Sequence, residues 1–288
     1  MINNGSLFRL FTGMRQVGSP TSRQANVAYK TKIRLGLALV LAFIFLHPGS
    51  GLYAQQAEDL SVKKSKHFII YYSEVSSGYA SRVARQAEHY YKSVINYLGF
   101  NRFDFWTWDN RCKIYLYPNQ ESYQEATDAE HWSMGRVHVG KKEISTYAKR
   151  AQFLDYTLPH EMGHIIFREA VGFDKDLPLW IDEGIATLQE KDRDKYLLTA
   201  RIFVREKNFI SLEDLSNIRS YTQISPLVFY SESASIMEFL LERFSRREFV
   251  AFCHRLRDGE EWEDALLRTY KFEDLQQLED AWIKGVQP

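Results

Sequence analysis

The chain has 288 residues and a formal net charge of zero, and 45% of its residues are hydrophobic and 15% aromatic. This composition indicates a globular protein with enough apolar material for one large domain or two small ones. Residues 1–54 hold six basic and no acidic residues, so the rest of the chain carries an acidic excess of six. This balance excludes an overall basic protein, and we expect no nucleic-acid partner.

Residues 30–54 have the pattern of an export signal. Basic residues precede the uncharged run 35–46, Pro48 and Gly49 end this run, and Ala54 is a small residue after which cleavage can occur. The run has twelve residues, whereas a membrane span needs about 20. We therefore expect a cleaved signal and an exported protein, periplasmic or secreted. A membrane anchor formed by residues 35–46 is the alternative.

Between residues 67 and 147, short apolar runs alternate with stretches of helical period. The run HFIIYY at 67–72 predicts the first strand, and the apolar residues of 79–98 lie at helical spacing. We predict strands at 67–72, 113–117, 135–140 and 143–147, and helices at 79–98 and 121–129. His138 lies near a turn, where a lone histidine usually faces solvent.

The stretch 157–190 contains the motif HEMGH, which begins at His160, ends at His164 and is followed after eighteen residues by Glu183. Side chains at i and i+4 of an α-helix share one face, with Cβ atoms about 5–6 Å apart, so the two imidazoles can converge on one ion. Catalytic zinc usually has three protein ligands and an open position for water, and two histidines with a glutamate are a recurring set. The spacing predicts a zinc site formed by these three residues.

Glu161 follows the first histidine directly and lies about 100° further round the helix, beside the metal position. Zinc lowers the pKa of water towards about 7, and a neighbouring carboxylate can then take a proton as the water attacks a carbonyl. This is the chemistry of peptide hydrolysis. An HExxH string also arises by chance, but this string and Glu183 each lie in a stretch whose apolar residues predict a helix, which favours a metal site over a structural role. Pro159 predicts that the helix starts or kinks near Thr157.

The HEMGH motif, its eighteen-residue spacing and the sequence LWIDEG around Glu183 resemble the gluzincin metallopeptidases. The resemblance is strongest to the catalytic domain of the aminopeptidase N family and its short peptidase-MA-like relatives, and it covers about residues 157–190. It implies one Zn²⁺ held by His160, His164 and Glu183, with Glu161 as general base. It also implies an α+β, thermolysin-like zincin fold, in which a small mixed sheet and the active-site helix pack on a C-terminal helical subdomain.

Two further residues, Thr187 and Tyr230, match the same family less closely. Thr187 lies where the family often has a small hydroxyl residue near the site. Tyr230 begins the sequence YSESA, which resembles the family segment whose tyrosine hydrogen-bonds the oxyanion of the intermediate, with Tyr221 as the fallback. Such a donor contributes about 2.7–4 kcal/mol to lowering the barrier. The hairpin at 135–147 lacks the Met-Glu-Asn segment with which aminopeptidases grip the substrate's amine, so the resemblance implies hydrolysis without implying aminopeptidase specificity.

Beyond Glu190 the pattern predicts helices to the end of the chain, with an N-cap at Ser211. Four of these helices are predicted to span residues 231–244, 247–257, 261–270 and 273–284. We therefore divide the chain into a leader with the signal peptide, a sheet and active-helix subdomain, and a helical subdomain, with a cleft between the last two. These parts span residues 1–54, 55–190 and 191–288.

Cys112 and Cys253 are the only cysteines, and the sequence leaves open whether they form a disulfide or stay buried thiols. The best-supported function is an exported zinc metallopeptidase acting on a peptide or protein substrate. Two alternatives stay open, namely an inactive zinc-bearing scaffold protein and a metal-dependent hydrolase of a non-peptide bond. The sequence does not distinguish an endopeptidase from an exopeptidase, and it does not reveal the physiological target.

Overall fold

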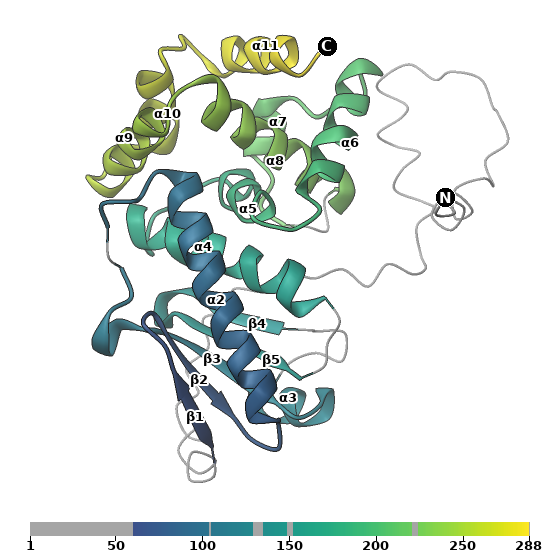
Figure 1. The fold of residues 1–288 in the computed structure, drawn as a ribbon. Coiled ribbons are helices and arrows are strands. Elements are labelled where there is room, and N and C mark those ends of the chain that lie inside the picture. Colours follow the sequence, from purple (N-terminus) through teal and green to yellow (C-terminus); the bar gives the residue numbers. More distant parts are fainter. Residues whose placement is uncertain (1–59, 104, 129–134, 149–151, 221–223, 288) are drawn as a thin grey trace, which may run out of the picture. The chain divides into compact units, whose positions relative to one another are not determined.

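The computed structural model describes residues 60–287 except 104, 129–134, 149–151 and 221–223 (Figure 1). The predicted leader with its uncharged run 35–46, and the fallback Tyr221, lie outside these residues. No helix within the described ranges is long and apolar enough to cross a membrane.

A five-stranded mixed sheet forms the first half of the described chain. Its order is β1-β2-β3-β5-β4, with a parallel core of β2, β3 and β5 and an antiparallel strand at each edge. The strands are β1 (Ser61–Lys64), β2 (Phe68–Tyr72), β3 (Cys112–Tyr117), β4 (Gly135–His138) and β5 (Glu143–Tyr147). The predicted small mixed sheet is therefore confirmed. The pattern missed β1, because all four of its residues are exposed and it has no buried position to detect.

One face of the sheet is buried against helices. Side chains alternate between the two faces of a strand, so the apolar residues at every second position share one face. The helix α2 (Ser77–Leu98) packs against β1 and β2 on this side, as well as against α4 (Leu158–Val171). The buried strand residues are Phe68, Ile70, Cys112, Ile114, Leu116, Val137, Ile144 and Thr146. On the opposite face, Tyr123 of α3 (Gln120–Thr127) contacts Tyr117 and Tyr147.

The second half of the chain is helical, as predicted. Three of the predicted helices match to within two residues at each end, whereas α8 starts five residues earlier than expected, because Ser225 and Pro226 begin it. Ser211 caps α7 by accepting a hydrogen bond from Asp214, as predicted. The helices are α5 (Leu179–Thr187), α6 (Arg193–Arg205), α7 (Leu212–Ser216), α8 (Pro226–Arg243), α9 (Arg246–Arg257), α10 (Trp262–Tyr270) and α11 (Leu275–Val286). The predicted boundary at residue 190 falls between α5 and α6. Because α5 packs against both α4 and α8, this division stays a prediction.

Buried polar contacts fix the helices that surround α5 and α8. The indole of Trp180 donates to Ser216 Oγ at 2.9 Å, which joins α5 to α7, and Trp282 donates to Ser235 Oγ at 3.0 Å, which joins α11 to α8. Both tryptophans are fully buried, so each N–H needs such a partner. The two cysteines, left open by the sequence, are free and buried.

The helices α4, α5 and α8 approach one another closely at two glycines. A Cβ added to Gly163 of α4 would lie 2.8 Å from Cα of Ala186 in α5. A Cβ added to Gly184 of α5 would lie 2.4 Å from the carbonyl oxygen of Ser233 in α8. Real Cβ atoms do not make contacts this short, so these backbones can pack at this distance only because both residues are glycine. The middle helix, α5, is thereby held between the other two.

We predict that Gly184→Ala destabilises the fold by about 1–3 kcal/mol, because the added methyl group overpacks the α5–α8 contact. Urea denaturation followed by circular dichroism measures the loss. Gly78→Ala in α2 is the matched control, since no atom lies within 4 Å of its added Cβ. That control should be neutral or stabilising by up to about 1 kcal/mol. Equal stabilities of the two variants would contradict the close approach of α5 and α8.

Candidate metal centre

The helix α4 presents both histidines of the HEMGH motif on one face. Its α-helical part begins at Leu158, with Pro159 in the first turn, and a π-helical turn, η5 (Phe153–Thr157), leads directly into it. Proline is tolerated there because N–H groups in the first turn have no partner within the helix. The structure therefore agrees with a helix start near Thr157. One turn separates His160 from His164, so their rings stand side by side above α5.

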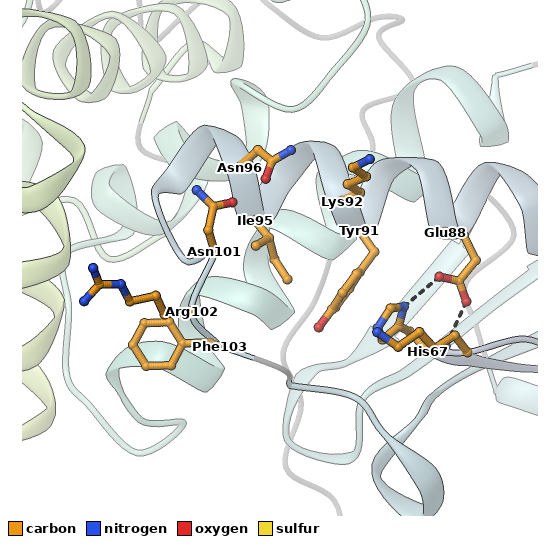
Figure 2. Close-up of a pocket in the computed structure, with 10 residues that line it drawn as sticks. His67, Glu88, Tyr91, Lys92, Ile95, Asn96, Asn101, Arg102 and Phe103 are labelled. Carbon is orange, nitrogen blue, oxygen red and sulfur yellow. Dashed lines mark hydrogen bonds and ion pairs between the residues drawn. The ribbon is translucent and has the colours of Figure 1, made fainter.

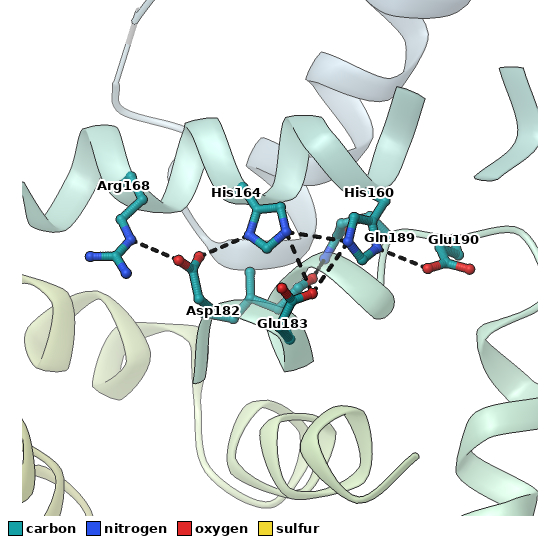
Figure 3. A network of polar contacts seen from close by, with 8 residues as sticks. His160, His164, Arg168, Asp182, Glu183, Gln189 and Glu190 are labelled. Atoms are coloured by element: carbon teal, nitrogen blue, oxygen red, sulfur yellow. Dashed lines mark hydrogen bonds and ion pairs between the residues drawn. The ribbon is translucent and has the colours of Figure 1, made fainter. Parts of the chain in front are cut away.

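Three ligand atoms from α4 and α5 form a compact triangle (Figure 3). The Nε2 atoms of His160 and His164 are 3.2 Å apart. Oε2 of Glu183 lies 3.4 Å from Nε2 of His160 and 3.6 Å from Nε2 of His164. Ligand atoms about 2.0–2.1 Å from a tetrahedral zinc ion lie about 3.3–3.4 Å from one another. The three predicted ligands therefore fit the geometry of a zinc site.

The electrostatics of the triangle also favour a cation. Burial alone would lower the pKa of His160, but hydrogen bonding and the charges of Glu183 and Glu190 outweigh it and raise the pKa well above its usual range. For His164, burial is likewise outweighed by the charges of Glu183 and Asp182, and its pKa is raised. All five side chains are largely buried. Buried carboxylates around the two imidazoles stabilise positive charge at this place. A bound metal ion would supply that charge.

The outer nitrogen of each histidine is held by a second carboxylate. Nδ1 of His160 lies 2.8 Å from Oε1 of Glu190, and Nδ1 of His164 lies 3.0 Å from Oδ1 of Asp182. When each Nδ1–H donates to its carboxylate, the Nε2 lone pair is left for a metal. Asp182 also accepts from Nε of Arg168 at 2.8 Å. Burial would raise the pKa of Asp182, but His164 and Arg168 lower it to about 2, so this carboxylate stays ionised.

Glu161 and Thr187 bring further buried polar atoms to these two helices. Glu161 is 2% exposed, and burial raises the pKa of its carboxyl group. Its Oε2 has no hydrogen-bond partner among the described residues, and neither has the hydroxyl of Thr187, which is fully buried. A buried polar atom without a protein partner is unfavourable unless a water molecule or a ligand binds to it. The carboxylate of Glu161 therefore fits a role in contact with water or substrate.

Tyr230 of α8 lies against the triangle. Its ring centroid is 6.4 Å from that of His160, in an edge-on arrangement. Burial, followed by the charges of Glu183, Glu161 and Glu190, raises the pKa of Tyr230 far above its usual value. The hydroxyl is therefore protonated at neutral pH and can donate a hydrogen bond. The structure thus brings all five predicted site residues together.

The family model of the Peptidase MA superfamily matches residues 107–287 of the chain. The chain belongs to the Peptidase MA superfamily. No curated protein matches its sequence significantly. The matched range includes α4, α5 and α8, which carry every residue of the triangle and Tyr230. The predicted relationship to peptidase-MA-like metallopeptidases is confirmed. Membership of the Peptidase MA superfamily indicates a peptidase.

The sequence did not reveal how this Peptidase MA member supports its two histidines. Asp182 stands in the motif LWIDEG, but adjacency to Glu183 gives it no role by itself. Glu190 lies beyond the end of α5 at Thr187, so no helical spacing relates it to His160. Arg168 lies on α4 and Asp182 on α5, so no helical spacing in the sequence relates them, and their ion pair is seen only in the structure.

We predict that Glu190→Gln in this Peptidase MA member weakens Zn²⁺ affinity by about 10- to 100-fold, because a neutral amide no longer polarises the imidazole of His160. Competition with a chromophoric chelator measures the affinity. Glu213→Gln, an exposed change on α7, is the control and should leave it unaltered. Unaltered affinity in Glu190→Gln as well would show that this hydrogen bond does not support metal binding.

Proposed function

We propose that this protein is a zinc-dependent metallopeptidase that hydrolyses peptide bonds. The single observation that carries the proposal is the triangle of His160, His164 and Glu183 with sides of 3.2–3.6 Å, with Glu161 next to it in the same motif. We assign the three residues as ligands of one Zn²⁺ and Glu161 as general base. When bound, the ion would supply Lewis acidity that lowers the pKa of water towards about 7 and polarises the scissile carbonyl.

Glu161 is suited to moving the proton in this reaction. Its buried carboxyl group has a raised pKa, which brings a carboxylate closer to the range in which general bases work at neutral pH. In the proposed mechanism its free oxygen takes a proton from the attacking water and delivers it to the leaving amine nitrogen.

Tyr230 supplies the hydrogen-bond donor in the proposed mechanism. Its hydroxyl is kept protonated by burial and by the carboxylates around it. As the carbonyl carbon becomes tetrahedral, negative charge develops on the carbonyl oxygen, and a fixed donor stabilises that charge more than it stabilises the substrate. Because Tyr230 comes from α8 and the ligands come from α4 and α5, the reaction depends on all three helices.

A peptide is the substrate that the sheet is suited to receive. The strand β4 is at the edge of the sheet, and its other side has no partner strand in the described ranges. The short helix η4 (Val139–Lys141), which directly follows β4, packs against α4. An extended peptide can add to such an edge through its main chain. The mixed sheet and the helical remainder of the chain support a thermolysin-like zincin arrangement, which we propose for this protein.

We also propose that the enzyme is exported, periplasmic or secreted, because residues 30–54 have the pattern of an export signal.

We predict that Glu161→Gln retains one Zn²⁺ per chain but loses peptide hydrolysis by at least about 100-fold, because the amide cannot accept the proton of water. Metal analysis of the full-length protein and mass spectrometry of a mixed peptide library measure the two properties. Glu125→Gln, an exposed change on α3, should match the wild type in both. Zinc without hydrolysis in the wild type would favour a scaffold or a non-peptide hydrolase, and absence of zinc would refute the ligand assignment.

We predict that Tyr230→Phe lowers kcat by about 10²- to 10³-fold with little change in KM or zinc content, because the donor acts mainly on the transition state. Steady-state kinetics on a peptide found in the library measure the two constants. Tyr90→Phe, which removes a half-buried hydroxyl on α2, is the matched control and should keep the wild-type kcat. A wild-type kcat in Tyr230→Phe would remove this residue from the mechanism.

A further inference from the structure

A hollow lies beside the C-terminal half of α2 (Figure 2). Its volume is about 630 Å³, and the turn before β2, the helix α2 and the residues that follow α2 line it. None of its lining residues belongs to the metal centre. All of them precede residue 107, where the match to the Peptidase MA superfamily begins. The hollow is therefore built by a part of the chain that the family model does not include.

The inner wall of the hollow is preformed. His67 is buried, its Nδ1 lies 2.6 Å from Oε2 of Glu88, and its backbone N–H donates to Oε1 of the same carboxylate at 2.8 Å. The His67 ring stacks on Tyr91 at a centroid distance of 4.0 Å. The hydroxyl of Tyr91 in turn accepts a hydrogen bond from the backbone of Phe105 at 3.1 Å. These contacts fix the inner wall before any ligand binds, which lowers the entropy lost on binding.

The rim of the hollow is basic, although the chain after residue 54 has an acidic excess. Lys66, Lys92 and Arg102 line it, and all three are exposed. Lys92 and Arg102 make no ion pair with any described residue. Glu88 is the acidic lining residue, and its two carboxylate oxygens contact the backbone N–H and Nδ1 of His67. Lys92 and Arg102 together outnumber this one carboxylate, so the hollow presents an excess of positive charge to an incoming ligand.

The basic groups are spread along the hollow rather than directed at one point. Lys92 and Asn96 are one turn apart on α2, about 6 Å along its axis. Asn101, Arg102 and Phe103 lie beyond the end of the helix, as Figure 2 shows. Figure 2 shows Lys92 on the helix and Arg102 beyond its end, so a ligand that contacts both side chains must extend along the hollow. A chain with several carboxylates and an apolar side chain would match the charges and the half-buried ring of Phe103 together.

We propose that this hollow is a docking site for an acidic peptide segment of a partner protein. The carboxylates of the segment pair with Lys92 and Arg102, the amides of Asn96 and Asn101 bond its main chain, and an aliphatic or aromatic side chain packs on Phe103. Exposed ion pairs are individually weak, so affinity depends on several acting together. Binding at this site needs neither zinc nor hydrolysis.

The test is fluorescence anisotropy with a labelled peptide of alternating glutamates around one phenylalanine, and with the same peptide carrying glutamine for glutamate. The full-length protein carries Glu161→Gln, so that the probe is not cleaved. The double change Lys92→Glu with Arg102→Glu should weaken binding of the acidic peptide by about tenfold or more. Raising the salt concentration should weaken it as well, because these charges are exposed.

The matched control is Arg82→Glu with Arg85→Glu, which makes the same change of charge at exposed positions of α2 that do not line the hollow. It should bind the acidic peptide with nearly wild-type affinity. Equal losses in the two double variants would reduce the effect to net charge and overturn the proposal. So would equal binding of the glutamine peptide, or complete displacement of the acidic peptide by inorganic phosphate at a matched ionic strength.

Discussion

The close approach of α4, α5 and α8 is the constraint on which the site depends. A glutamate on one helix can meet two histidines on another only if the helix backbones come close together, and Gly163 and Gly184 make this possible. The first brings α5 against the HExxH helix, and the second brings α8 against α5. The Glu183 carboxylate consequently lies between the two imidazoles and the Tyr230 helix.

The charge arrangement follows from that packing. Two imidazoles and several carboxylates are buried in a small volume, which is unfavourable for isolated charges. Paired contacts reduce this cost, because Glu190 and Asp182 hold the outer nitrogens and Arg168 holds Asp182. The carboxylates of this cluster raise the pKa values of the two histidines, so the cluster favours added positive charge. A divalent ion would satisfy the cluster and would leave the two histidines neutral, as ligands must be.

The sequence predicted those features that depend on residues close together in the chain. Helical spacing places His160 and His164 on one face, and alternation of buried residues identifies β2, β3 and β5. The distance in sequence from His164 to Glu183 follows from no local rule. The intervening residues include the end of α4 at Gly172, whose φ is +109°, and an irregular turn. The usual ligand set of catalytic zinc suggested Glu183, and the resemblance to a known family supported it. Tyr230 was found through that resemblance alone. Nothing in the sequence indicated the basic hollow, since three separate segments supply its walls.

The proposed function requires that α4 and α5 together hold one zinc ion. Zinc K-edge X-ray absorption on the purified full-length protein tests it most directly, because the spectrum reports which atoms surround the metal. We predict one zinc per chain with nitrogen and oxygen neighbours at about 2.0–2.1 Å, an imidazole signature from two histidines, and loss of this spectrum in Glu183→Ala. A sulfur neighbour, a fully hydrated ion, or an unchanged spectrum in Glu183→Ala would contradict the claim.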